Sequence, residues 1–163
     1  MLNWSKIFLE WLVNKIPEGT RLGKNDVLLA NIVLRVSREA TSKGLRPVLL
    51  SAIKQIHPLD RGPAAKKMRE RVEIFRKHKE EIVQDGHIST QKLNEFAPSI
   101  TLIRTVFSED YFVAFEGNSR VAALQEVFEG ERDITVDVEV LTLPKDSPML
   151  KDISQLRKRY GLE

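Results

Sequence analysis

The chain has 163 residues, of which 42% are hydrophobic and 30% charged, and its formal net charge is +3 at pH 7. These proportions are ordinary for a globular domain, and the length suffices for one domain with a substantial core. The chain contains no cysteine, which excludes disulfides, zinc–thiolate sites and cysteine nucleophiles. The small basic excess permits contact with nucleic acid without requiring it.

The first 46 residues predict a helical element. Trp4 and Trp11 are seven residues apart in an amphipathic stretch and therefore share one helix face. Packing on the domain core is the simpler interpretation of this face. Docking to a protein partner or to a membrane surface is the alternative. A second helix is expected over 24–41, with Gly44 at its C-terminal end.

The N-terminal stretch does not resemble a targeting segment. Lys6, Glu10 and Lys15 interrupt it, and it has neither a basic start nor a small-residue cleavage site. No other apolar run approaches the length of a membrane span. We therefore expect a cytoplasmic protein without a membrane-spanning segment.

The remainder of the chain predicts an α/β (α+β) fold, a small mixed sheet wrapped by helices. Residues 48–56 are apolar and their pattern leaves helix and strand open. The other expected elements are helices over 64–84 and 89–96, strands over 100–107, 111–115 and 134–141, and a last helix from Ser147 that ends in the basic residues 157–159. The helix over 64–84 carries many charges, which the simpler interpretation places on a solvated face.

The most informative segment is YFVAFEGNSRVAALQEVF, residues 111–128. An alternating apolar pattern stops at Glu116-Gly117-Asn118-Ser119-Arg120, and a helical pattern begins at once. A strand that turns through glycine into a helix brings free N–H groups and the positive helix end together, which suits a phosphate. Arg120 can donate two bonds to phosphate oxygens, and Ser119 adds a hydroxyl. The simpler interpretation is a turn capped by Asn118 or Ser119.

These residues resemble the signature loop of the ParB/sulfiredoxin superfamily. In that family a strand ends in an acidic residue, Gly, a variable pair and Arg, and a helix of small residues follows. The segments 57–61, 98–101 and 134–141 resemble other parts of the family, so the likeness covers roughly Val48 to Thr142. It implies a ParB/sulfiredoxin-like fold that binds phosphates of nucleotides or nucleic acids at the loop, with His57 brought near it.

The chain also departs from this family. Ser119 stands where the family often has His, and the thiol chemistry of sulfiredoxin is impossible without cysteine. No helix-turn-helix follows the signature, which leaves too little chain for a complete chromosome-partition protein. We therefore predict a stand-alone domain over 47–145, preceded by the helical element over 1–46 and followed by a packed helix over 146–163.

The leading hypothesis is a nucleotide- or DNA-phosphate-binding protein with phosphohydrolase activity on ATP, on DNA or on both. The predicted phosphate ligands are Gly117, Asn118, Ser119, Arg120, Arg61, Lys66 and Lys67. The last three lie near a helix start, where cations are unfavourable unless an anion is present. Glu116 could hold Mg²⁺ or orient an attacking water, with Arg120 as its catalytic partner. A structural pairing of Glu116 with Arg120 is the simpler interpretation.

Two other functions remain open from the sequence. The same superfamily includes small plasmid-encoded factors that block conjugative DNA transfer, and such an interaction protein would dock through the Trp4/Trp11 face. The third hypothesis is a sequence-independent DNA-binding module without hydrolysis, whose affinity would fall steeply with salt.

Overall fold

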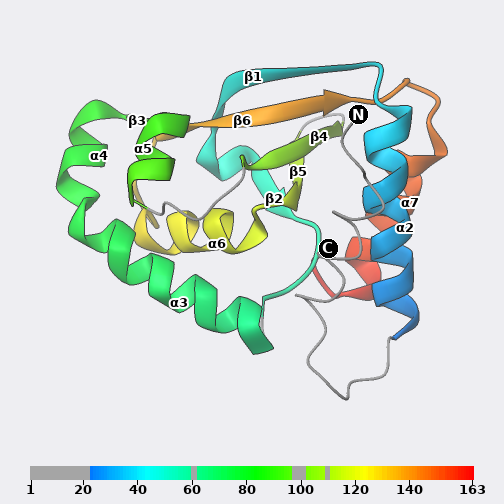
Figure 1. Ribbon diagram of the computed structural model, residues 1–163, viewed down its shortest axis with the longest axis horizontal. Coiled ribbons are helices and arrows are strands. Elements are labelled where there is room, and N and C mark those ends of the chain that lie inside the picture. Colours follow the sequence, from blue (N-terminus) through cyan, green and yellow to red (C-terminus); the bar gives the residue numbers. More distant parts are fainter. Residues whose placement is uncertain (1–22, 60–61, 97–101, 109–110) are drawn as a thin grey trace.

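A mixed sheet forms the middle of the fold in the computed structural model, which describes residues 23–59, 62–96, 102–108 and 111–163 (Figure 1). The strands, in sheet order, are β1 (Ser42–Leu49), β6 (Thr135–Thr142), β4 (Arg104–Ser108), β5 (Tyr111–Glu116) and β2 (Ile53–Gln55), with β3 (His87–Ile88) paired to β6. Antiparallel pairs join β1 to β6 and β4 to β5, whereas β2–β5, β4–β6 and β3–β6 are parallel. The expected mixed α/β (α+β) architecture is therefore confirmed.

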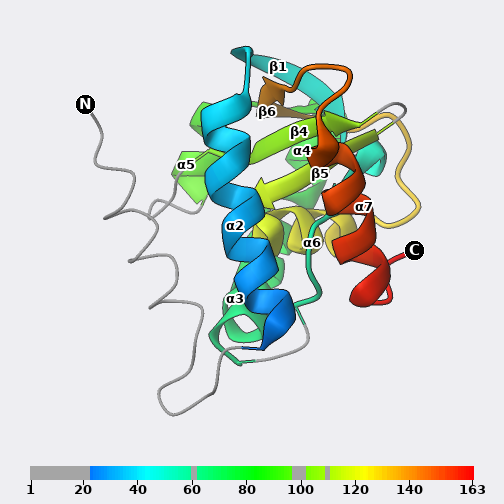
Figure 2. The same ribbon diagram turned by 90° about the vertical axis from the view of Figure 1, so that its right-hand side faces the viewer.

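Helices cover both faces of this sheet. The helices are α2 (Lys24–Glu39), α3 (Gly62–Lys77), α4 (Lys79–Asp85), α5 (Thr90–Phe96), α6 (Asn118–Val127) and α7 (Pro148–Arg159). Figure 1 shows α3 to α6 on one side, and Figure 2 shows α2 and α7 in front of the opposite face. Within the described ranges, none of these helices is long and apolar enough to cross a membrane.

The alternating burial of the strands divides the apolar core into two parts. On β5, Ala114 belongs to the cluster under α3 and α6, whereas Val113 and Phe115 belong to the cluster under α2 and α7. This is the period of two that places successive side chains on opposite faces. The predicted last helix is confirmed: Ser147 caps α7 by accepting a hydrogen bond from the Met149 backbone N–H at 3.3 Å, and Ile153 is buried in the second cluster.

Two expectations about the elements were wrong in detail, and one segment that the pattern left open is now assigned. Gly44 does not end a helix but lies in β1, which pairs with β6 over eight positions and also contains the expected domain boundary at residue 46. The ambiguous segment 48–56 divides into the end of β1, a 3₁₀ turn (η1, Leu50–Ala52) and β2. The helix over 64–84 breaks at His78, whose ring stacks on that of Phe96 with centroids 4.0 Å apart.

Arg157 joins α7 to the edge of the sheet through hydrogen bonds. Its side chain is 3% exposed, although the sequence placed it in a basic helix end. Nη1 donates to the Gln55 carbonyl, Nη2 donates to the Leu162 carbonyl at 3.1 Å, and Nε donates to Glu163 at 3.1 Å. A buried guanidinium with its donors occupied is a structural group.

We predict that Arg157→Met lowers the free energy of unfolding by about 2–4 kcal/mol, because hydrogen bonds to charged groups contribute about 1.5–3 kcal/mol each. Urea denaturation followed by circular dichroism measures this loss. Lys158→Met is the matched control, since Lys158 is the next residue and is exposed. Equal stability of the two variants would contradict a structural role for Arg157.

Candidate anion-binding site at the start of helix α6

The turn between β5 and α6 has the predicted form. β5 ends at Glu116, Gly117 has φ 83°, and α6 begins at Asn118. A Cβ atom at Gly117 would lie 3.1 Å from Ile103 Cγ1 and 3.2 Å from Ile103 Cα. Glycine is therefore required here by both the left-handed backbone and the close approach of another segment. The N-cap is Gly117 itself, so the expected cap at Asn118 or Ser119 was wrong.

Asn118 joins the start of α6 to the end of β2 instead of capping its own helix. Its side chain is 2% exposed, and Oδ1 accepts a hydrogen bond from the Ile56 backbone N–H at 3.2 Å. Nδ2 is buried without a hydrogen-bond partner among the described residues. His57, which follows Ile56 in the sequence, is also buried. The segment that begins at His57 thus starts beside the loop, although Asp60 and Arg61 lie outside the described residues.

Arg120 is a buried cation whose donors are not all used. Its side chain is 1% exposed, and Nε and Nη2 have no hydrogen-bond partner in the described part of the chain. Burial and the nearby Arg71 guanidinium lower the pKa of Arg120 to about 9, while Glu116 opposes this shift. The guanidinium is therefore still charged at neutral pH. Buried charges are normally paired, so this arrangement is costly unless a partner is supplied.

Arg71 on α3 brings a second guanidinium to the same place. It donates a hydrogen bond to the Ser119 hydroxyl, and burial lowers its pKa. Helix α3 packs along α6, as Figure 1 shows, so the two positive side chains come from neighbouring helices. Sequence reasoning missed Arg71 because it placed the charges of this helix on a solvated face. One signal was available: Arg71 adjoins the core residue Val72.

The predicted lysines are placed unequally relative to this site. Lys67 lies one turn before Arg71 on the same side of α3, because residues four apart share a helix face. Lys66 is rotated from Arg71 by about 140° at 3.6 residues per turn. Both lysines are exposed, and Lys66 lies 4.0 Å from Glu70, so the helical spacing brings Lys67 nearer to Arg71 than Lys66 but buries neither at the site.

Glu116 is bound to Arg104, not to Arg120 as the simpler interpretation supposed. Its Oε2 accepts from Arg104 Nη1 at 2.9 Å, and Arg104 Nε donates to Glu139 at 2.7 Å. Across the described ranges, no group of three or more His, Asp or Glu side chains could hold a metal ion. The predicted Mg²⁺ position thus has one protein carboxylate, already bound to an arginine, which does not make a metal site by itself.

The chain matches no protein-family model, no curated protein and no solved structure. The likeness to the ParB/sulfiredoxin superfamily therefore remains an interpretation of the sequence, and the function has to be argued from the geometry of the site.

We predict that Gly117→Ala destabilises the protein more than Gly130→Ala. Both glycines have positive φ, 83° and 84°, and a non-glycine residue in this region costs about 1–2 kcal/mol. Only position 117 adds a close contact, because a Cβ at Gly130 would have nothing within 4 Å. Thermal unfolding of both variants measures the difference. A smaller loss for Gly117→Ala would show that the turn is not tightly packed.

Proposed function

We propose that the protein binds the phosphate groups of a nucleotide at the start of α6, with Arg120 as the principal ligand. The observation that carries this proposal is the buried Arg120 guanidinium, whose Nε and Nη2 have no hydrogen-bond partner among the residues that the structure describes. Within the same ranges, Asn118 Nδ2 is a further donor without a partner at this helix end. Helix N-termini favour anions, and guanidinium groups match the oxygens of a phosphate.

The charge at this place favours a doubly charged phosphate. The charge of Arg71 lowers the pKa of Arg120, and Arg104 binds the carboxylate of Glu116. Two neighbouring positive charges, only partly offset by Glu70 and Glu116, are best balanced by a dianion, such as the terminal phosphate of a nucleotide, whereas each DNA phosphodiester carries one charge. We therefore place a nucleotide before DNA as the ligand.

Access to the site involves a local opening. Arg120 and Asn118 are almost wholly buried, whereas Arg71 and Ser119 are partly exposed and form the accessible side. An anion would first contact Arg71 and Ser119. It would then reach Arg120 when the part of the protein that buries Arg120 moves aside. Such local openings are typical of ligand-binding segments.

Hydrolysis of the bound phosphate is the second part of the proposal. Phosphoryl transfer needs positioning and charge neutralisation, for which Arg120, Arg71 and the α6 N-terminus are suited. It also needs a group that orients water, and Glu116 is the residue that we assign to this role. Glu116→Gln should then abolish phosphate release from ATP without weakening nucleotide binding.

We predict that Arg120→Met removes phosphate binding without loss of stability in the absence of ligand. Replacing an unpaired buried charge by an apolar side chain is neutral or stabilising by about 1–4 kcal/mol. In the wild-type protein, phosphate at 100 times its Kd should raise stability by about 2.7 kcal/mol. This corresponds to a shift of about 5–10 °C in Tm, which should be absent in Arg120→Met.

Arg157→Met is the matched control for this measurement, because Arg157 is equally buried but has its partners. It should lose stability and keep the phosphate-dependent shift in Tm. Duplex DNA without terminal phosphates should stabilise the wild-type protein less than free phosphate does, when both are present at the same concentration of phosphate groups. Wild-type phosphate affinity in Arg120→Met would refute the assignment of the site.

We predict that anion affinity falls as the pH rises through about 9, the pKa of Arg120 in the free protein. Sulfate is the suitable probe, since its charge is constant in this range. The sign for stability is the opposite: burial lowers the pKa of Arg120 from its ordinary value, so the cost of burying the charge is full below pH 9 and is relieved as the pH rises above it. Calorimetric titration with sulfate between pH 7 and 10 measures the affinity, and a flat profile would contradict the role of Arg120.

A further inference from the structure

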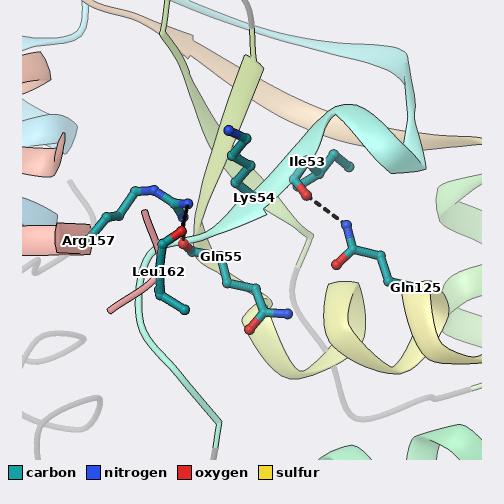
Figure 3. Close-up of a pocket in the computed structure, with 6 residues that line it drawn as sticks. All are labelled: Ile53, Lys54, Gln55, Gln125, Arg157 and Leu162. Carbon is teal, nitrogen blue, oxygen red and sulfur yellow. Dashed lines mark hydrogen bonds between the residues drawn. The ribbon is translucent and has the colours of Figure 1, made fainter. Parts of the chain in front are cut away.

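A cavity lies at the outer edge of β2, between α6 and α7 (Figure 3). Its volume is about 320 Å³, and its lining residues are Ile53, Lys54, Gln55, Gln125, Arg157 and Leu162. This volume lies at the lower end of the range for ligand pockets, about 300–1,000 Å³. The lining combines two side-chain amides with two cationic side chains and one accessible apolar residue, Leu162, which is a composition suited to a small polar heterocycle.

Two side chains fix the walls of this cavity. Gln125 Nε2 donates to the Leu50 carbonyl at 3.0 Å and to the Ile53 carbonyl at 2.7 Å. Arg157 donates to the Gln55 carbonyl. The β2 carbonyls of Ile53 and Gln55 are therefore already occupied, which makes the cavity unsuitable for pairing with an added strand. The same bonds orient the Gln125 amide, so that its Oε1 is a fixed acceptor.

Gln55 supplies the adaptable polar group of the cavity. Figure 3 shows Gln55 among the lining residues. Its side-chain amide makes no hydrogen bond within the described part of the chain. An amide offers a donor and an acceptor side by side, which is the pattern that Gln presents to the N6 and N7 edge of adenine. Leu162 provides apolar contact for a flat ring.

The cavity and the start of α6 are linked by the same helix and strand. Asn118 binds the Ile56 backbone N–H, and Gln125 binds the Ile53 carbonyl. The seven-residue separation on α6 corresponds to about 10 Å. The three-residue separation at β2 also corresponds to about 10 Å. Asn118 and Gln125 therefore share a helix face about 10 Å apart, so a nucleotide with its base in the cavity would reach Asn118 first and then Arg120, which is rotated from Gln125 by about 140° around the helix.

We infer that this cavity binds the amino-bearing base of the nucleotide whose phosphates are held at the start of α6. The inference rests on the proposed function and adds the base specificity to it. Gln55 reads the amino edge of the base, Gln125 Oε1 accepts from it, and Lys54 stands at the rim with its ammonium over the Tyr111 ring, 4.0 Å from the centroid.

The test compares calorimetric titrations of ATP, UTP and tripolyphosphate with the wild-type protein, Gln55→Ala and Gln155→Ala. Gln155 is the control because it is an exposed glutamine on α7. ATP should bind more tightly than UTP and tripolyphosphate. Gln55→Ala should weaken ATP about 3- to 10-fold, the effect of one hydrogen bond, and leave tripolyphosphate unchanged. Gln125 is not substituted, because its amide holds two backbone carbonyls.

The side-chain amide signals of Gln55 provide a second measurement by NMR, and they should shift with ATP but not with tripolyphosphate. If ATP and tripolyphosphate bind equally and Gln55→Ala does not change the affinity for ATP, the base site is overturned and the phosphate site stays intact. Equal binding of ATP and UTP would overturn recognition of the amino edge. Absence of binding by all three ligands at low salt would overturn the proposed phosphate site and with it this inference.

Discussion

The close packing of α6 against the sheet and α3 determines where the polar groups of this protein lie. The middle of the helix is Val121-Ala122-Ala123-Leu124, all buried, and its small side chains let the surrounding backbone approach closely. Such packing leaves no path to solvent for a long side chain on the first turn. Arg120 is consequently held inside the protein, and the two amides of the helix, Asn118 and Gln125, bind the backbone around β2. Both proposed ligand contacts follow from this one helix.

The two buried arginines illustrate how partners decide the role of a side chain. Arg157 and Arg120 are 3% and 1% exposed, so they lose nearly the same hydration on folding. Arg157 recovers it through two carbonyls and a carboxylate, whereas Nε and Nη2 of Arg120 have no partner in the described part of the chain. A charge buried without partners is costly. The proposed phosphate ligand would supply the missing acceptors.

The sequence predicted the features that depend on local patterns. The turn through Gly117, the hairpin of β4 and β5, and the alternation of β6 all have short-range signals, and the structure confirms them. β1 was missed because SKGLRPVL carries no strand period: six of its eight residues are exposed before Val48, and its order comes from pairing with β6. Lys43 and Pro47 are typical of an edge strand, and that signal was available. Arg71 was missed because its contact with Ser119 joins residues 48 positions apart, which no local pattern reveals.

The ion pairs behind the loop explain why Glu116 does not pair with Arg120. Glu116 lies four residues before Arg120 and would be the obvious carboxylate for it, but Gly117 redirects the chain between them. Arg104 on β4 then bonds Glu116 and, across the sheet, Glu139 on β6. The parallel pairing of β4 with β6 sets Arg104 opposite Glu139, and its antiparallel pairing with β5 sets it opposite Glu116. Sheet register thus binds the Glu116 carboxylate to Arg104 and leaves Arg120 without a carboxylate partner among the described residues, as the proposed anion site requires.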